Sequence, residues 1–374
     1  MMTRRSVLIV QADPAVREQL AAALIAPGRT VVTCGDAAAA RTILEKHPVA
    51  AVVADVRLND DFGFDGLALL DVLPRSLTVL MTAHEMPEAL IQEVARRGAD
   101  CCLRNDDLET IAARVAAVVP AGLDGPPRVI RVPAFETLIT SVNLIPCFQP
   151  IVNLSEGDGA PHGYESLARY RGQVPFCDCE FLFQYAARLG RVADLELACL
   201  RQTLRWGATL ARRGKLFINL HPEVFSKGGE LSRTVLQECR ANGVPLENLV
   251  LEITEQGPLV DVQAAATCAE ELRAAGVQFA FDDVGVSYSH LSFIDQIKPA
   301  YLKISQHFGT DFETSGSKRK IIRNIVALAA DFDCEVVIEG IEEAATAGAA
   351  TEMGAKFGQG FLYSKPRDAG AFSS

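Results

Sequence analysis

The sequence lacks the features that define several classes of protein. It contains no run of about 18 uncharged apolar residues, the length that a membrane-spanning helix requires. The apolar stretch after Arg5 ends at Gln11, which is too early for the core of a signal peptide. Runs of lysine and arginine are missing and the formal net charge is −11, so no binding surface for a long nucleic acid is expected. These absences predict a cytoplasmic protein that binds neither a membrane nor long nucleic acid.

The cysteines also lack a recognisable pattern. All ten are scattered, and neither a zinc-ligand spacing nor the framework of a secreted disulfide-rich domain is visible. Low-complexity tracts are absent, while 49% of the residues are hydrophobic and 22% are charged, a balance typical of globular chains. At 374 residues, two hydrophobic cores are expected, with the cysteines reduced.

The first third of the chain alternates short β-branched runs with alanine-rich helical stretches. The expected strands are VLIV (7–10), TVV (30–32), AAVVA (50–54), LTVLMT (77–82) and CCL (101–103). This alternation predicts an α/β domain, residues 1–120, with a flavodoxin-like doubly wound parallel sheet. Residues 121–133 are rich in proline, glycine and charge, show no helical or strand period, and are expected to be a linker.

Residues 134–374 repeat the alternation on a larger scale. The expected strands include KLFINL (215–220), NLVLEI (248–253), VQFAFDD (277–283), AYLKIS (300–305), CEVVIEG (334–340) and KFGQGFL (356–362). Amphipathic helices separate them, one spanning about 321–332. This plan predicts a (β/α)₈ TIM-like barrel. FQPIVNL (148–154) and GYESLARY (163–170) are spaced like a hairpin, so one irregular antiparallel strand is expected.

Polar residues stand at or near the ends of successive barrel strands, where α/β barrels carry their chemistry. They are Glu165, Asn219, Glu252, Asp282, Asp283, Lys303, Glu339 and Gln359. Oxygen-rich sets of this kind suit Mg²⁺ or Mn²⁺. Two divalent ions and one lysine would balance the five carboxylates, which predicts a two-metal phosphodiesterase. The alternative, that each carboxylate is a solvated loop residue or a helix cap, is favoured for any one alone but not for all together.

These residues lie in motifs that resemble the EAL family of cyclic-di-GMP phosphodiesterases, from about residue 134 to 366. The matching segments are FQPIVNL (148–154), ESLARY (165–170), FINLHP (217–222), LEITE (251–255), FAFDDVGVSYSHL (279–291), YLKIS (301–305), VIEGIE (337–342) and FGQGFLYSKP (357–366). The resemblance implies a first metal ion held by Glu165, Asn219, Glu252 and Asp282. It implies a second held by Asp282, Asp283 and Glu339.

The resemblance also implies roles for the neighbouring residues. Lys303 and Glu339 would act on the attacking water, with Gln359 supporting that end of the site. Arg169 and Gln149 would contact the substrate, although Arg169 could instead be an exposed charge. Glu255 would brace the loop after Asp283. The implied product is linear pGpG, and the implied assembly is a homodimer.

The sequence departs from the family pattern in places. The signature Glu-Ala-Leu reads Glu165-Ser166-Leu167, and Ser305 stands where an aspartate often follows Lys-Ile. The loop usually written DDFGTGYSS reads DDVGVSYSH (282–290), with Val284, Val286 and Ser287 in place of Phe, Thr and Gly. A serine cannot relieve backbone strain as glycine does. The alternative function is therefore a catalytically weak or inactive module that binds cyclic-di-GMP, or a scaffold that does neither.

Residues 6–119 resemble a response-regulator receiver of two-component signalling. Asp55 takes the phosphoacceptor position, but Gln11 and Ala12 stand where an acidic pair normally holds Mg²⁺. Arg104 replaces the usual lysine, and Asp13 lies one residue beyond the acidic position. The resemblance favours a pseudo-receiver that serves dimerisation or binds a signalling partner, with a working phosphoswitch as the alternative.

Overall fold

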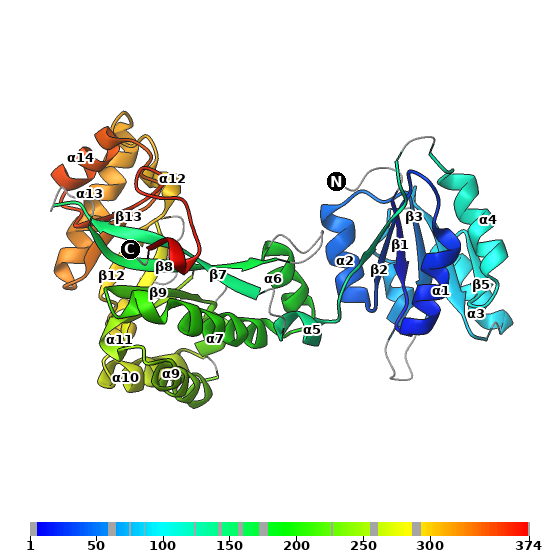
Figure 1. The fold of residues 1–374 in the computed structure, drawn as a ribbon, viewed down its shortest axis with the longest axis horizontal. Helices are drawn as coiled ribbons and strands as arrows, with labels where there is room; N and C mark the ends of the chain where they lie inside the picture. The colour runs from blue at the N-terminus through cyan, green and yellow to red at the C-terminus, as the bar shows by residue number, and fades with distance from the viewer. Residues whose placement is uncertain are drawn as a thin grey trace. The chain divides into compact units, whose positions relative to one another are not determined.

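The computed structural model divides into two compact units (Figure 1). The first unit comprises residues 1–141 and 170–190, and the second comprises residues 142–169 and 191–374. The structure describes residues 6–58, 65–74, 76–85, 87–122, 125–140, 144–155, 160–171, 179–225, 227–254, 261–285 and 293–372. Within these residues, no helix combines the length and the apolar character needed to cross a membrane.

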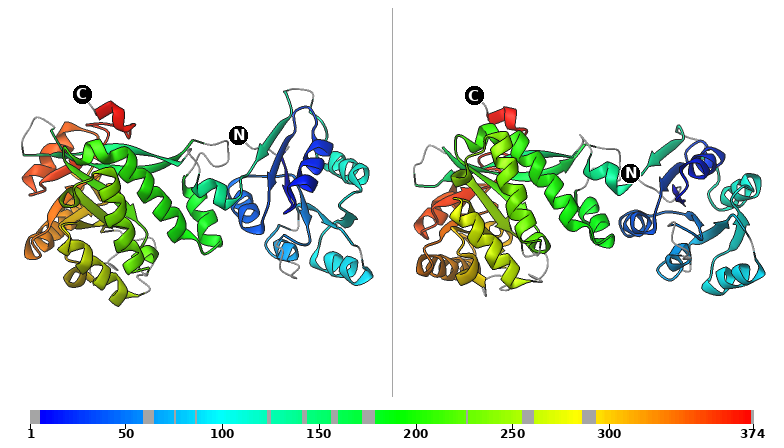
Figure 2. Two further views of the ribbon diagram at one scale, coloured as in Figure 1. Left: turned by 60° about the horizontal axis from the view of Figure 1, so that its bottom comes forward. Right: turned by 90° about the horizontal axis from the view of Figure 1, so that it is seen from below.

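The first unit is built on a parallel six-stranded sheet in the order β5-β4-β3-β1-β2-β6. Its strands are β1 (Ser6–Val10), β2 (Thr30–Cys34), β3 (Ala51–Asp55), β4 (Thr78–Ala83), β5 (Cys101–Arg104) and β6 (Arg128–Arg131). The helices are α1 (Pro14–Leu24), α2 (Ala37–Lys46), η1 (Asp65–Leu69), α3 (Glu88–Arg97), α4 (Leu108–Val118) and α5 (Phe135–Ile139). Helices lie on both faces of the sheet (Figure 2), which confirms the predicted flavodoxin-like fold.

Local sequence explains where these helices begin and what they cover. Asp13, Asp36 and Asp107 cap the N-termini of α1, α2 and α4, each accepting hydrogen bonds from backbone N–H groups of the first turn. In β1, alternate residues point to opposite faces of the sheet, and Val7 and Ile9 pack in one core cluster with residues of α1 and α4.

Strand β6 lies within the segment predicted to be an irregular linker, so that prediction was wrong for Arg128–Arg131. The strand pairs in parallel with β2, and the Arg131 guanidinium makes two hydrogen bonds of 2.6 and 2.7 Å to Glu18 on α1. The pattern failed because four residues are too few to show a period beside prolines and a glycine.

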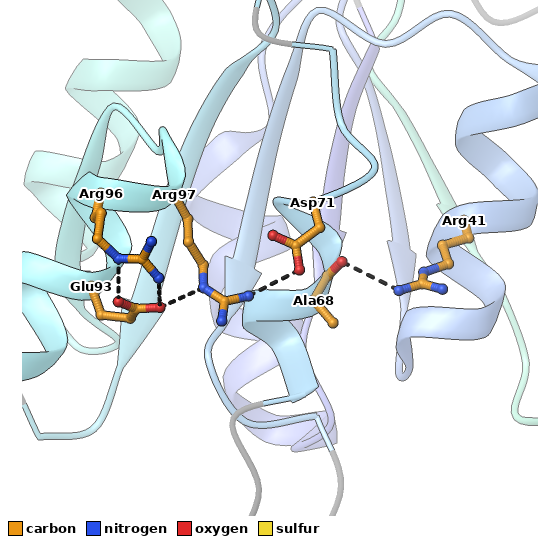
Figure 3. Close-up of polar contacts among 6 residues, drawn as sticks. All are labelled: Arg41, Ala68, Asp71, Glu93, Arg96 and Arg97. Carbon is orange, nitrogen blue, oxygen red and sulfur yellow. Dashed lines mark hydrogen bonds and ion pairs between the residues drawn. The ribbon is translucent and has the colours of Figure 1, made fainter.

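Polar contacts hold the segment around η1 against its neighbouring helices. The Arg41 side chain on α2 donates to the Ala68 carbonyl at 3.2 Å, as Figure 3 shows. On α3, the Arg97 guanidinium bridges Asp71 at 3.0 Å and Glu93 at 2.7 Å. These contacts join the residues between β3 and β4 to both α2 and α3.

The first unit also includes helix α6 (Cys179–Arg188), although its sequence lies beyond the first barrel strands. The Tyr185 hydroxyl donates to Asp36 at 2.5 Å, and the Arg188 side chain donates to Thr42 of α2 at 3.1 Å. Burial, followed by the nearby Asp36 carboxylate, raises the pKa of Tyr185, so the phenol remains a donor. Helix α6 is therefore fastened to α2 by its side chains.

The second unit is a closed barrel in the order β10-β11-β12-β13-β14-β7-β8-β9. Its strands are β7 (Leu144–Asn153), β8 (Pro161–Tyr170), β9 (Lys215–Leu220), β10 (Leu249–Ile253), β11 (Gln278–Val284), β12 (Tyr301–Ile304), β13 (Glu335–Ile338) and β14 (Phe357–Gln359). Strand β14 pairs in antiparallel fashion with β7, while the successive pairs from β8 to β14 run parallel. The predicted barrel with one irregular antiparallel strand is confirmed.

Helices cover the outside of the barrel and an apolar cluster fills its lower part. The helices are α7 (Val192–Ala211), α8 (Pro222–Phe225), α9 (Gly229–Asn242), η2 (Leu246–Asn248), α10 (Val262–Ala274), α11 (Ile294–Ile297), α12 (Gln306–Gly309), α13 (Gly316–Asp331), α14 (Ala344–Glu352) and η4 (Ala369–Phe372). The helix predicted from about 321 begins earlier because Ser315 caps α13. The apolar cluster consists of Ile151, Phe217, Val250, Ala280, Tyr301, Val337 and Phe357, and it forms a floor beneath the polar strand ends.

Candidate functional site

A buried lysine stands at the centre of the polar strand ends. The Lys303 side chain on β12 is 0% exposed, and its ammonium lies within 3.2 Å of four carboxylates. The distances from Nζ are 3.2 Å to Glu165, 3.0 Å to Glu252, 3.2 Å to Asp282 and 2.7 Å to Glu339. A single buried positive charge thus faces four potential negative charges.

Amide side chains hold the carboxylate of Glu165 from both sides. Asn219 Nδ2 donates to Oε1 at 2.7 Å, and Gln359 Nε2 donates to Oε2 at 2.7 Å. Gln359 Nε2 also lies 3.0 Å from Oε1 of Gln149, whose own amide donates to the Ser364 carbonyl. These contacts place residues of β7, β8, β9 and β14 in one hydrogen-bonded layer.

Strand register explains why these residues meet. Glu252 and Asn219 are direct partners across the β10–β9 pair, and Glu165 stands opposite Phe217 across the β8–β9 pair. Because neighbouring side chains alternate in direction, Glu165 faces the interior while Ser166 faces the outer helix α7. The Ser166 hydroxyl lies 2.7 Å from that of Thr203 on α7, so the serine of the Glu-Ser-Leu signature is accommodated with a partner.

The two consecutive aspartates of β11 depend on an irregular backbone. In a regular strand Asp282 and Asp283 would point to opposite faces of the sheet. The register with β12 shifts between Phe281 and Val284, and Asp283 has a positive φ of 54°. Such bulges re-aim side chains near active sites. Both carboxylates consequently line the same cavity.

Burial and charge shift the pKa values of the cluster. Burial raises the pKa of Glu252 well above its ordinary value, raises that of Asp282, and raises that of Glu339 to about 8. Burial also acts on Glu165, but the Lys303 ammonium and the amide donors outweigh it and lower the pKa of Glu165. Burial disfavours the Lys303 ammonium, yet the surrounding carboxylates raise its pKa well above the usual value. The cluster therefore carries more acid groups than one cation can neutralise.

A cavity of about 840 Å³ opens above this cluster. Six predicted site residues besides Glu165 line it: Gln149, Arg169, Asp282, Asp283, Glu339 and Gln359. The Arg169 guanidinium donates to the Ala168 carbonyl at 2.8 Å. Asn219, Glu252 and Lys303 contact the cluster without lining the cavity. Glu255, Val286 and Ser287 lie outside the residues that the structure describes.

The cluster contains oxygen atoms that could bind a divalent cation. Asn219 Oδ1, Glu252 Oε2 and Gln359 Oε1 are buried and have no hydrogen-bond partner. Unpaired oxygens are costly to bury and are the ligands that Mg²⁺ and Mn²⁺ prefer. Within the described ranges, no three carboxylate, imidazole or thiolate groups already converge on one point. The oxygen chemistry fits a divalent cation, while the Lys303 ammonium stands between the carboxylates.

A further buried carboxyl group near the site was not predicted. Glu196 on α7 accepts a hydrogen bond of 3.0 Å from the backbone N–H of His221, two residues beyond Asn219. Burial raises the pKa of Glu196 to about 8. The sequence held a signal for this residue, because Glu196 lies one helical turn from both Val192 and Leu200 on an apolar face.

The receiver-like site of the first unit is different. Asp55, which is 5% exposed, accepts hydrogen bonds of 2.8 Å from the amides of Gln11 and Asn105 at Oδ2 and from the Arg57 backbone at Oδ1. Arg104 turns to Asp106 instead, with contacts of 3.0 and 3.1 Å. Both carboxylate oxygens of Asp55 therefore already accept hydrogen bonds from N–H groups of the protein.

Asp13, one residue beyond the position of the usual acidic pair, caps a helix. Its Oδ1 accepts hydrogen bonds of 2.7 and 3.1 Å from the backbone N–H groups of Ala15 and Val16. This is the N-cap of α1, so the carboxylate is engaged with the helix.

Comparisons with known proteins agree with both units. The chain matches the EAL domain over residues 134–366 and the response regulator receiver domain over residues 7–116. Bifunctional diguanylate cyclase/cyclic di-GMP phosphodiesterase MucR of Pseudomonas aeruginosa is 30% identical over 175 residues, which cover 47% of this chain and 25% of MucR. Cyclic di-GMP phosphodiesterase PdeR of Escherichia coli is 28% identical over 226 residues, which cover 57% of this chain and 33% of PdeR.

The barrel is also similar to a solved structure. BlrP1 of Klebsiella pneumoniae, in a manganese/cy-diGMP complex, is 25% identical with a TM-score of 0.53, over 62% of this chain and 57% of that chain. The chain spans between 25% and 36% of the length of the curated relatives that it matches. With the family motifs on successive strands of a closed barrel, the chain belongs to the EAL domain family and carries a response regulator receiver domain ahead of the barrel.

Proposed function

We propose that the barrel hydrolyses one phosphodiester bond of cyclic-di-GMP to give linear pGpG, using two Mg²⁺ or Mn²⁺ ions. The observation that carries this proposal is the excess of carboxylates around Lys303, at the base of a cavity and beside unpaired oxygens. Cations would neutralise that excess and favour the ionised carboxylates. The names of MucR and PdeR, and the manganese/cy-diGMP complex of BlrP1, support this substrate and this type of metal.

The residues present would hold the ions on oxygen atoms. Glu165, Asn219, Glu252 and Asp282 would bind one ion, and Asp282, Asp283 and Glu339 the other. When bound, such ions supply charge neutralisation at the phosphodiester and lower the pKa of water. The protein contributes the buried amide layer, which fixes the orientation of Glu165 through Asn219 and Gln359.

The remaining side chains act on water and on the substrate. The Lys303 ammonium and the Glu339 carboxylate, 2.7 Å apart, would orient the attacking water, and Glu339 would accept its proton. Arg169 and Gln149, at the cavity wall, would contact the substrate. Attack of the water oxygen on phosphorus breaks the bond to the 3′ oxygen, which leaves as a hydroxyl after taking up a proton from solvent, while Glu339 returns to solvent the proton that it accepted from the water. The products carry one 5′-phosphate and one free 3′-hydroxyl, as in pGpG.

For the first unit, we propose a pseudo-receiver whose Asp55 is not phosphorylated. Phosphorylation of an aspartate requires a divalent ion beside it, and here neutral amides occupy the carboxylate. Binding of a signalling partner and formation of a homodimer are the roles we propose for this unit.

The test is incubation of the full chain with cyclic-di-GMP and Mg²⁺ or Mn²⁺, followed by chromatography of the nucleotides. Appearance of pGpG that EDTA abolishes is the expected result. Calcium should not support hydrolysis, because its longer bonds and looser coordination disturb in-line attack. Binding of intact cyclic-di-GMP without cleavage would favour the alternative of an inactive binding module, and absence of both binding and cleavage would leave only a scaffold.

A further inference from the structure

Helix α7 directs two buried polar side chains toward the barrel strands. Glu196 is 6% exposed and Thr203 is 3% exposed. They are seven residues apart, so they lie two helical turns from each other on one face of α7. Polar groups on a buried helix face are costly unless they have partners. Thr203 has its partner on a strand that carries a residue of the candidate site, and Glu196 has its partner directly after another such strand.

Thr203 contacts the strand that carries Glu165. Its hydroxyl is 2.7 Å from that of Ser166, which follows Glu165 on β8. Since adjacent side chains on a strand point in opposite directions, a contact that fixes Ser166 on the outside also fixes the direction of Glu165 on the inside.

Glu196 contacts the strand that carries Asn219. Its Oε1 accepts a hydrogen bond of 3.0 Å from the N–H of His221, which directly follows β9. Asn219 is two residues earlier and donates to Glu165 at 2.7 Å. The two contacts of α7 are therefore made one residue from Glu165 and two residues from Asn219, the two partners of one hydrogen bond.

We propose that Glu196, Thr203 and Ser166 are positioning residues that hold the Glu165–Asn219 hydrogen bond and thereby set the affinity of the site for a divalent cation. The part of this inference that concerns the cation rests on the proposed function. The part that concerns the Glu165–Asn219 hydrogen bond does not. A hydrogen bond between neighbouring strand ends depends on their relative height and rotation, which a shared rigid helix fixes. The residues would not touch the substrate.

The first experiment measures the affinity of the full chain for Mn²⁺ alone by calorimetry. Thr203→Val and Glu196→Ala should each weaken Mn²⁺ binding by about tenfold, the scale known for groups that orient metal ligands. Thr203→Ser and Glu196→Gln retain the hydroxyl or the acceptor oxygen and should restore the affinity. If the affinity is unchanged in Thr203→Val and Glu196→Ala, the inference is wrong.

Ser232→Ala is the matched control. The Ser232 hydroxyl is also buried and lies 3.3 Å from the Cys268 sulfur, between the outer helices α9 and α10. Its loss should lower the melting temperature but leave the Mn²⁺ affinity unchanged. An equal loss of affinity in this variant would show that general destabilisation, and not positioning, explains the result.

A second measurement separates this inference from the proposed function. The side-chain amide of Asn219 can be followed by NMR in the metal-free chain, where its N–H donates to Glu165. Thr203→Val and Glu196→Ala should shift this signal and speed its exchange with solvent, and Ser232→Ala should not. If the unaltered chain binds no Mn²⁺, the proposed function fails, and the Asn219 signal alone decides whether α7 positions the pair.

Discussion

The two units each place a carboxylate at the end of a parallel strand, but they satisfy it in opposite ways. Asp55 meets three neutral N–H donors, from Gln11, Asn105 and the backbone. Around Lys303, four carboxylates share a single ammonium, and nearby oxygens have no donor. An acidic residue at a strand end is thus not enough for a metal site. The site also needs negative charge and oxygen lone pairs that the protein has left uncompensated.

The largest difference should appear when one carboxylate is removed from each site. Glu165→Ala and Glu339→Ala should each lower cyclic-di-GMP hydrolysis by at least about a hundredfold, because each deletes electrostatic stabilisation worth several kcal/mol. Asp55→Asn should have little effect. Turnover is measured on purified, folded variants.

A matched control for this prediction is Glu335→Gln. Glu335 begins β13, the same strand that Glu339 follows, but pairs with Lys356 at an exposed position. Activity should be unchanged in this variant. Near-normal turnover in Glu165→Ala or Glu339→Ala would contradict the proposed metal ligands.

The receiver site should become able to bind Mg²⁺ if acidic residues are restored to it. The natural chain should show no labelling of Asp55 by acetyl phosphate or beryllofluoride with Mg²⁺. The triple variant Gln11→Asp, Ala12→Asp, Arg104→Lys replaces the amide donor with Mg²⁺ ligands and adds a compact ammonium. It should become labelled, as intact mass spectrometry or fluorine NMR would show. Stoichiometric labelling of Asp55 in the natural chain would disprove the pseudo-receiver.

Removal of the ammonium should make the barrel site depend on metal for stability. In the metal-free chain, Lys303→Met leaves four acid groups, two of them buried, without a counterion, which should destabilise the barrel by about 3–5 kcal/mol at neutral pH. The loss should be smaller at low pH, where protonated carboxyls need no counterion, and smaller with Mn²⁺ present. Thermal unfolding with and without Mn²⁺ measures this, and equal melting of variant and natural chain would contradict the role of Lys303 as counterion.

The smallest effect concerns Glu196, a buried carboxyl with no ion pair among the contacts described. Burial raises its pKa from 4.5 to about 8, so the folded chain holds a proton that the unfolded chain releases. This proton favours folding at low pH, and the stability it provides is lost as the pH rises from about 4.5 to 8. Glu196→Gln should remove this loss and raise the melting temperature at pH 8 by a few degrees, with little change at pH 5. An equal shift at both pH values would contradict the assigned pKa.

Much of the barrel site could be predicted from the sequence for a simple reason. Charged residues such as Glu252 and Lys303 interrupt buried apolar strands, and parallel strands bring their carboxyl ends to one edge. What could not be predicted was the partner of each group. The place of Lys303 among four carboxylates depends on strand register, and the bulge at Asp283 has no sequence signature of its own.

Contacts between helices and strands were beyond sequence reasoning as well. The pairing of Thr203 with Ser166 depends on how α7 is rotated about its axis against β8, which hydrophobic periodicity limits only to a broad face. Strand β6 depends on an exposed edge of β2 that a distant segment can reach. In both cases the information lies in tertiary packing and not in the local pattern.

The membership of α6 in the first unit has a consequence for how such proteins can be recombined. The chain passes between the two units three times, after Ser141, after Arg169 and after Gly190. A receiver that is simply appended to a barrel would require one passage. Here a gene fragment that began at the EAL match, at residue 134, would encode α6 without the helix α2 to which Tyr185 and Arg188 are bonded. The start of the EAL match at residue 134 therefore does not coincide with the boundaries between the two compact units. Exchange of the receiver for another domain would consequently require redesign of α6.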